Sequence, residues 1–173
     1  ARLDLGSTAK LRTLITYLEL IAELHGRWSG LSAGQLAALN VSARDPLSRW
    51  ARDYLAHAAD KRLAPMLEAA MQRSYSANPG EGFFTGGGLH YFENFEPADN
   101  HRTMSVREAL TRSVNLVFIR LMRDVVHHVM ARARARAPRC WTTCPIRGGA
   151  SIWRVSPTRK AARSSAAFNA STP

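Results

Sequence analysis

Cysteine is almost absent from this chain of 173 residues. Its two cysteines, Cys140 and Cys144, lie in the last quarter, and the first 139 residues contain none. One pair cannot form the framework of bridges that stabilises a small disulfide-rich protein. The Cys-x-x-x-Cys spacing, with no histidine nearby, is also a poor zinc site, because structural zinc usually takes four such ligands. The sequence therefore excludes a disulfide-rich domain and offers no zinc motif.

Long apolar runs are also lacking. The longest, at residues 116–130, is interrupted by Arg120, Arg123 and Asp124, whereas a transmembrane helix needs about 20 mostly apolar residues. The first residues form no apolar segment, so no signal peptide is expected. The chain begins with Ala1 and not with methionine, and we expect it to start inside a larger protein.

Acidic residues are missing from residues 131–173, which carry nine Lys and Arg. Residues 1–130 carry 15 Lys and Arg against 13 Asp and Glu. Almost all of the formal net charge of +11 therefore belongs to the last quarter of the chain. A basic protein is a candidate for nucleic-acid binding. The near-neutral charge of residues 1–130 argues against it for that part, and we expect no nucleic-acid partner.

The residues that are present suffice for one folded domain. The chain is 46% hydrophobic, which predicts folding and not disorder. Apolar residues at helical spacing, with Asp-Pro as a start signal and glycine as a stop signal, define the expected helices. These cover residues 8–25 (ending near Gly26), 31–39, a segment opened by Asp45-Pro46, 63–72, 106–112 (with Ser105 and Glu108 as a capping box) and 116–129.

Glycine and aromatic residues mark residues 76–102 as a region of loops. The triplet at 86–88 lacks the lysine and the strand-to-helix setting of a phosphate-binding loop, so it predicts a flexible turn. The aromatic residues could line a ligand site, but a small satellite core beneath a long loop is the favoured interpretation. They are Phe83, Phe84, Tyr91, Phe92 and Phe95.

The segment with the most chemical content is Gly6-Ser7-Thr8-Ala9-Lys10. If Ser7 opens a helix, Lys10 lies three residues on, on the same face. A lysine amine whose pKa is lowered by burial can take the proton of a serine hydroxyl and activate it as a nucleophile. The alternative is a serine that caps the helix, with a solvated lysine one turn later.

Two further segments complete a pattern that resembles the transpeptidase domain of penicillin-binding proteins, most closely the bifunctional, high-molecular-weight kind. Ser-x-x-Lys with a Ser-x-Asn-type second element is part of the signature of that superfamily. The likeness covers residues 1–130 and implies an α+β penicillin-binding-protein/serine β-lactamase-like fold, here mostly its α-helical part. It rests on Gly6-Ser7-Thr8-Ala9-Lys10, Glu93-Asn94-Phe95-Glu96-Pro97-x-x-Asn100 and Ser105-Val106-Arg107-Glu108-Ala109-Leu110-x-x-Ser113-Val114-Asn115.

The resemblance implies a role for four residues. Ser7 would be the nucleophile that forms an acyl-enzyme, and Lys10 its general base. Ser113 would relay a proton between Lys10 and the leaving amine, and Asn115 would hydrogen-bond the substrate amide or Lys10. The implied partners are a peptidoglycan stem peptide and β-lactam antibiotics, with no metal or organic cofactor. The parent protein would be anchored at the periplasmic face of the bacterial inner membrane. Ordinary turn chemistry between two helices is the alternative for Ser113 and Asn115.

Two departures from the family pattern reduce the expected activity. No lysine precedes Thr-Gly or Ser-Gly: the three lysines are Lys10, Lys61 and Lys160. In the family, a strand that carries Lys-Thr-Gly or Lys-Ser-Gly lines the cleft and supplies one oxyanion N–H, and the loss of one such donor costs roughly 3–4 kcal/mol. The strands that precede the serine are also missing, because Ser7 stands so near the first residue. We therefore expect a fragment with little or no activity alone.

Residues 131–173 mix Arg, Ala, Pro, Ser, Cys and Trp without apolar periodicity. One interpretation is a disordered basic tail, and the favoured hypothesis is a change of reading frame near residues 131–139. Two other functions stay open. The chain could be a non-enzymatic basic module that binds nucleic acid or anionic membrane through this tail, or a serine β-lactamase. No carboxylate is placed to activate a deacylating water, which favours transpeptidase over β-lactamase.

Overall fold

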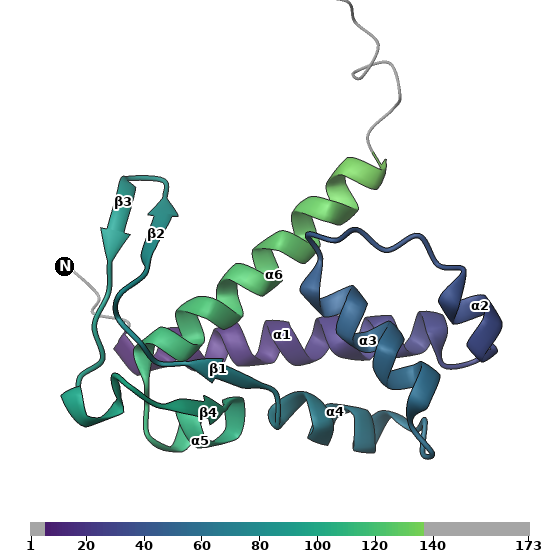
Figure 1. Cartoon of the computed structure of the whole chain (residues 1–173), viewed down its shortest axis with the longest axis horizontal. Helices are drawn as coiled ribbons and strands as arrows, with labels where there is room; N and C mark the ends of the chain where they lie inside the picture. The colour runs from purple at the N-terminus through teal and green to yellow at the C-terminus, as the bar shows by residue number, and fades with distance from the viewer. Residues whose placement is uncertain (1–5, 137–173) are drawn as a thin grey trace, which may run out of the picture. The chain divides into compact units, whose positions relative to one another are not determined.

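The computed structural model of the protein describes residues 6–136. The chain divides into two units, at residues 1–137 and 138–173, and all described residues belong to the first. The hypotheses about the basic tail beyond residue 136 therefore lie outside the described residues. The helices are α1 (Gly6–Trp28), α2 (Ala33–Ala37), α3 (Pro46–His57), α4 (Leu63–Met71), α5 (Val106–Thr111) and α6 (Asn115–Arg136), with a 3₁₀ turn, η1, at Pro97–Asp99 (Figure 1).

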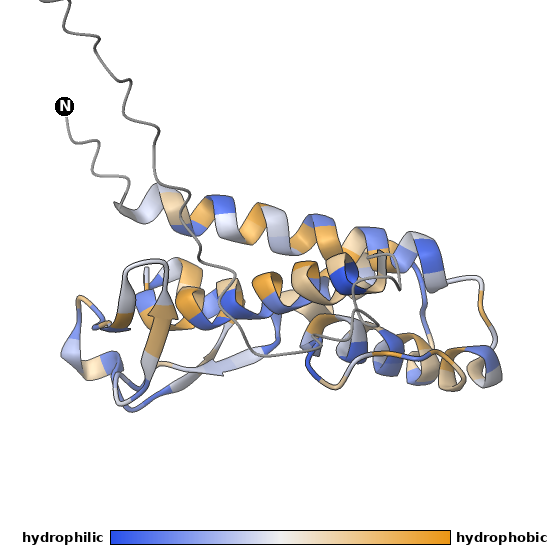
Figure 2. Cartoon of the chain, turned by 90° about the horizontal axis from the view of Figure 1, so that it is seen from above, coloured by the Kyte–Doolittle hydropathy of each residue, from blue (hydrophilic) through white to orange (hydrophobic). Residues whose placement is uncertain are grey.

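The two long helices, α1 and α6, pack against each other and form the centre of this unit. Figure 2 shows them side by side, and Figure 1 shows that α6 runs at an angle to α1. Helices α3 and α4 pack on α1, and α3 also contacts α6. The core between these helices is apolar and almost fully buried; it includes Tyr17, Ile21, Leu24, Leu47, Leu55, Val117 and Leu121.

Helix α1 is amphipathic as predicted, because its buried residues recur at intervals of three and four, but the apolar Leu11 and Ile15 in its first half are about half exposed. The predicted end near Gly26 is wrong: the helix continues to Trp28. A glycine inside a helix costs about 1 kcal/mol relative to alanine. Trp28 is 8% exposed, and burial of a large apolar side chain recovers more than that cost.

The predicted start of α3 is confirmed. Asp45 is the N-cap, where its Oδ1 accepts a hydrogen bond from the Ser48 N–H at 3.0 Å, and Pro46 is the first helical residue. Helix α4 also lies where it was predicted. The expected short helix at 31–39 is shorter, Ala33–Ala37, and begins with a capping box formed by Ser32 and Gln35.

The prediction of loops for residues 76–102 is wrong in part: this region contains a β-hairpin, and a second small antiparallel sheet flanks it. Strands β1 (Ser74–Ser76) and β4 (Thr103–Ser105) form the flanking sheet, and β2 (Gly82–Thr85) and β3 (Gly88–Tyr91) form the hairpin. The hairpin turn contains the glycine triplet, and Gly88 has a φ of +112°, which favours glycine. The triplet is thus the predicted turn.

The predicted satellite core of aromatic residues is wrong for most of its members. Phe83 is buried, but Phe84, Tyr91 and Phe95 are 87%, 69% and 90% exposed. Successive side chains of a strand point to opposite faces, and a two-stranded hairpin has only one face covered. Phe84 and Tyr91 lie on the uncovered face, and Phe95 lies outside the hairpin, in the segment between β3 and η1.

The capping box predicted before α5 is half formed. The Glu108 N–H donates to the Ser105 hydroxyl at 3.1 Å, but the Glu108 carboxylate pairs with Arg102 at 2.6 Å. Helix α6 was expected at 116–129 and instead runs past the proposed boundary at residue 130, to Arg136. Among the described helices, none has both the length and the apolar content needed to cross a membrane.

Candidate functional site

The turn between α5 and α6 lies next to the first turn of α1. Two backbone hydrogen bonds close the end of α5: the Ser113 N–H donates to the carbonyl of Leu110, and the Val114 N–H donates to that of Ala109. Val114 is buried, which holds the turn against the core. Ser113 has a φ of +57°, a left-handed conformation that costs a residue with a side chain about 1–2 kcal/mol. The fold thus maintains an unfavourable backbone conformation at a predicted site residue.

Three of the predicted site residues form one chain of hydrogen bonds. The Ser7 and Ser113 hydroxyl oxygens are 2.9 Å apart. Lys10 Nζ lies 2.8 Å from the same Ser113 oxygen and also donates to the Ser113 backbone carbonyl. Ser113 therefore lies between the other two. Within the described residues, no hydrogen bond joins Lys10 directly to Ser7, which differs from the expected direct contact.

Lys10 is not the solvated lysine of the alternative interpretation. Partial burial lowers the pKa of its amine below the ordinary value of 10.5, because removal from water disfavours the charged form. Lys10 forms no ion pair with a carboxylate of the described part of the chain, so no anion stabilises its ammonium form. A larger fraction of neutral amine, which can accept a proton, follows from this environment.

Asn115 is the first residue of α6, and its side chain does not bind Lys10, one of the two partners expected for it. Its Nδ2 donates to the backbone carbonyl of Glu93 at 2.9 Å and not to Lys10. This bond fixes the amide plane. The carbonyl oxygen of the side chain accepts no hydrogen bond from any residue in the range 6–136, so it is available to a ligand.

All four predicted site residues line one cavity of about 350 Å³. The structure therefore brings together side chains that are up to 108 positions apart in the sequence, Ser7 and Asn115. Phe95 also lines the cavity, and its ring is largely exposed. A cavity that presents two hydroxyl groups, an amine and an amide has the groups needed for hydrolysis or transfer of an acyl group.

A second cavity, of about 810 Å³, also includes Lys10 and Asn115. Its wall is mostly apolar, with Phe118, Ile119 and Met122 from α6 and aromatic residues from the hairpin. Apolar neighbours cannot hydrogen-bond an ammonium group. Lys10 thus has apolar surroundings on one side and the Ser113 oxygens on the other.

Three residues that sequence reasoning assigned no role position this site. Asn94 is buried: its Nδ2 donates to the carbonyl of Ala77 at 2.8 Å, and its Oδ1 accepts from the Leu116 N–H at 3.0 Å. Asp99, 2% exposed, accepts two hydrogen bonds from Arg112, at 2.7 and 3.0 Å. Asn94 belongs to the segment Glu93–Asn100, one of the three on which the resemblance to penicillin-binding proteins rests. No pattern in the sequence pointed to the Asp99–Arg112 pair.

Comparison of the chain with known protein families, with curated proteins and with solved structures finds no match in any of the three. The functional assignment therefore depends on the sequence motifs and on the geometry around Ser113.

Proposed function

We propose that this chain carries part of a penicillin-binding, serine-type D,D-transpeptidase domain of the α+β class, with Ser7 as its nucleophile. The supporting observation is the position of the Ser113 hydroxyl oxygen, 2.9 Å from the Ser7 oxygen and 2.8 Å from Lys10 Nζ. A hydroxyl group can donate one hydrogen bond and accept others at the same time. Ser113 is therefore suited to pass a proton from Ser7 to Lys10.

In the proposed acylation step, Lys10 begins as a neutral amine. The Ser7 oxygen attacks the carbonyl carbon of a D-alanyl-D-alanine-type amide and forms a new C–O bond. The Ser7 proton moves to Ser113 while the Ser113 proton moves to Lys10, which becomes an ammonium group. The negative charge resides on the former carbonyl oxygen. The proton thus reaches Lys10 through Ser113 and not directly from Ser7, because the Ser113 hydroxyl lies between Ser7 and Lys10.

The second half of the step reverses the proton movement. The Lys10 ammonium group returns a proton through Ser113 to the amide nitrogen, the C–N bond breaks, and D-alanine leaves. The acyl group stays on Ser7 as an ester. Asn115 would orient the substrate amide through its free carbonyl oxygen, because its Nδ2 is already bonded to the Glu93 carbonyl. A β-lactam would acylate Ser7 in the same way, with ring opening in place of departure.

The proposed partners are the peptidoglycan stem peptide and β-lactams. The parent protein is proposed to act at the periplasmic face of the bacterial inner membrane. The chain contains no Lys-Thr-Gly or Lys-Ser-Gly sequence, so it lacks the family element that completes the oxyanion site. Loss of one oxyanion donor lowers the rate by about 10²–10³. We therefore expect slow acylation by this chain alone.

The proposal is tested with a fluorescent penicillin and mass spectrometry. The full chain is incubated for an extended time, digested, and searched for a penicilloyl adduct on the peptide that contains Ser7. We expect an adduct that is lost in Ser7→Ala. Thr8→Ala is the matched control, because it removes the neighbouring exposed hydroxyl of the same helix and leaves Ser7 in place.

Two results would contradict the proposal. One is an adduct that persists at full yield in Ser7→Ala, which would place acylation at another nucleophile. The other is the absence of an adduct on this serine both in the chain and in the complete parent protein, where any missing oxyanion element would be restored.

A further inference from the structure

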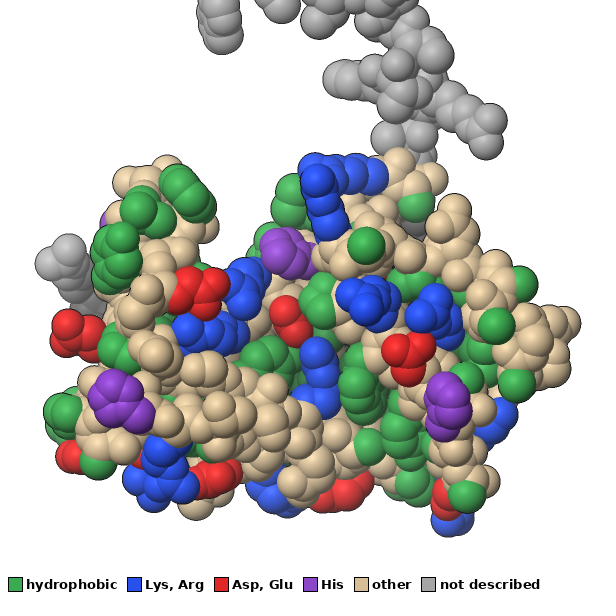
Figure 3. All heavy atoms as spheres, in the orientation of Figure 1, with side chains coloured by type: hydrophobic (Ala, Val, Ile, Leu, Met, Phe, Trp, Pro, Cys, Tyr) green, Lys and Arg blue, Asp and Glu red, His purple; other side chains and the backbone are tan. Residues whose placement is uncertain are grey.

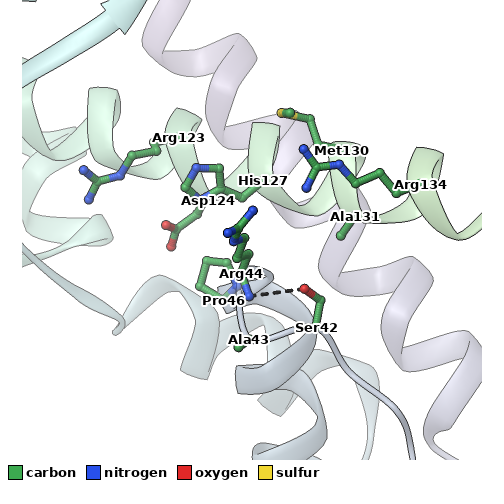
Figure 4. A pocket seen from close by; sticks show the side chains of 10 residues that line it. All are labelled: Ser42, Ala43, Arg44, Pro46, Arg123, Asp124, His127, Met130, Ala131 and Arg134. Carbon is green, nitrogen blue, oxygen red and sulfur yellow. Dashed lines mark hydrogen bonds between the residues drawn. The ribbon is translucent and has the colours of Figure 1, made fainter. Parts of the chain in front are cut away.

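A basic pocket lies between the loop that precedes α3 and the C-terminal half of α6. Its volume is about 620 Å³, and it shares no lining residue with the cavity that contains Ser7. Figure 4 shows the pocket, and Figure 3 shows basic side chains gathered with a histidine along this part of α6. Its basic lining residues are Arg44, Arg123, Arg134 and His127.

Two of these arginines form no ion pair with a carboxylate of residues 6–136. Arg44 and Arg134 are exposed, and neither forms an ion pair with a residue in the range 6–136. Arg44 projects from the loop toward α6, and the guanidinium group of Arg134 is turned back along α6 toward His127. A local turn holds the loop, because the Arg44 N–H donates to the Ser42 hydroxyl at 3.3 Å. The two guanidinium groups therefore approach the pocket from opposite walls.

The other charged groups at the pocket are already paired. Arg123 pairs with Glu81, which immediately precedes β2 and also pairs with Arg120. Asp124 is the acidic residue of the lining, and its Oδ2 accepts hydrogen bonds from Tyr75 at 2.7 Å and from Arg73 at 3.1 Å. The Asp124 charge is thus compensated by Arg73, which does not line the pocket. Among residues 6–136, the arginines of the pocket lining that form no ion pair are therefore Arg44 and Arg134.

We propose that this pocket binds the phosphate monoester group of an organic ligand. A phosphate monoester carries a charge of about −1.5 to −2 at pH 7, which matches the two free guanidinium groups. Guanidinium forms paired, charge-assisted hydrogen bonds to phosphate oxygens. Pro46 and Met130 supply an apolar wall for the organic part, and the volume falls within the about 300–1,000 Å³ of small-molecule sites. The ester can be a soluble molecule or the headgroup of a lipid.

Calorimetric titration of the full chain with phenyl phosphate tests the pocket. Arg44→Gln and Arg134→Gln should each weaken binding about tenfold or more, because each removes a charge-assisted contact. Arg49→Gln is the matched control: Arg49 is an exposed arginine of α3 that does not line the pocket. It removes the same charge and should weaken binding less than about twofold. This control also accounts for attraction of phosphate by the basic residues after position 136.

A chemical readout locates the bound ligand independently. Phenylglyoxal modifies exposed arginines, and phenyl phosphate should slow the modification of Arg44 and Arg134 but not of Arg49. Equal loss of affinity in all three variants, with no selective protection, would overturn the proposal and leave only non-specific attraction between charges.

Binding to phosphatidylcholine vesicles, with and without phosphatidic acid, distinguishes a lipid headgroup from a soluble phosphate ester. If Arg44→Gln binds the phosphatidic-acid vesicles more weakly than Arg49→Gln, the ligand is a lipid headgroup. If the two variants bind the vesicles equally while their affinities for phenyl phosphate differ, the ligand is a soluble phosphate ester. Both outcomes support the pocket.

Discussion

His128 Nδ1 lies 3.0 Å from a carboxylate oxygen of Asp45, and both side chains are buried. The Ser48 hydroxyl lies 3.2 Å from the same ring nitrogen. An acid, a histidine and a serine thus meet, but they do not form a nucleophilic triad. In a triad the acid and the serine bind opposite nitrogens of the ring, whereas here both lie at Nδ1. The cluster instead joins the start of α3 to α6.

This pair should stabilise the fold measurably. His128→Leu removes a buried hydrogen-bond partner of the Asp45 carboxylate and leaves Ser48 as its remaining partner, and loss of such a partner costs about 1–3 kcal/mol, more for a charged group. We expect urea denaturation of the full chain to show a loss of about 3 kcal/mol. His57→Leu, at the exposed end of α3, should change the free energy of unfolding by less than about 0.5 kcal/mol. Equal effects of the two substitutions would show that the Asp45–His128 contact contributes nothing.

Arg73 should be a second point of stability. Its guanidinium group lies 5.3–5.8 Å from the ring centres of Tyr17, Trp50 and Tyr75, and it pairs with Asp124 at 3.1 Å. It therefore connects elements from four parts of the chain. Arg73→Met removes the ion pair and three cation–π contacts and should lower the free energy of unfolding by about 3 kcal/mol.

Arg73→Lys separates charge from shape, because it keeps the positive charge but loses the planar group that stacks on aromatic rings. Its effect should be intermediate. Arg107→Met is the matched control for Arg73→Met, since Arg107 pairs with Glu68 at the surface, where such a pair is worth about 0–1 kcal/mol. A full return of stability in Arg73→Lys would assign the whole effect to charge.

Local sequence signals predicted the helix starts better than the helix ends. Asp45-Pro46 identified the start of α3, because N-cap and first-turn preferences depend on adjacent residues. The end of α1 was wrong because burial of Trp28 outweighs the stop signal at Gly26. The end of α6 was missed for another reason: the alternation of Ala and Arg at 131–136 has no apolar periodicity, yet both are strong helix formers.

The sequence predicted which residues line the candidate cavity, but it did not predict the hydrogen bonds between them. The spacing of Ser7 and Lys10 places them on one face of α1, whereas the pairing of Ser7 with Ser113 depends on the tertiary fold. The left-handed backbone of Ser113 could not be read from its sequence, because serine has no preference for that conformation. In the structure Ser113 lies between Lys10 and Ser7, in place of the expected direct contact between those two residues.

The backbone strain at Ser113 should be separable from the role of its hydroxyl. Ser113→Ala and Ser113→Gly both remove the hydroxyl, so both should abolish acylation of Ser7. Glycine adopts a positive φ without the side-chain penalty, so Ser113→Gly should be about 1 kcal/mol more stable than Ser113→Ala. Thermal or urea unfolding measures this difference. If alanine were the more stable variant, the φ of +57° would not be a source of strain.

The lowered pKa of Lys10 should appear in the pH dependence of acylation. Burial disfavours the ammonium form, and only the neutral amine can accept the proton that leaves Ser7. The rate of penicilloyl-adduct formation should therefore rise with pH and level off below the ordinary lysine value of 10.5. Lys10→Arg keeps a cation that cannot lose its proton in this range; it should lower the rate by about 10²–10⁴ and remove the pH dependence. Lys61→Arg, outside the cavity, should leave both unchanged. A rate that rises with the same midpoint in Lys10→Arg would assign the titration to another group.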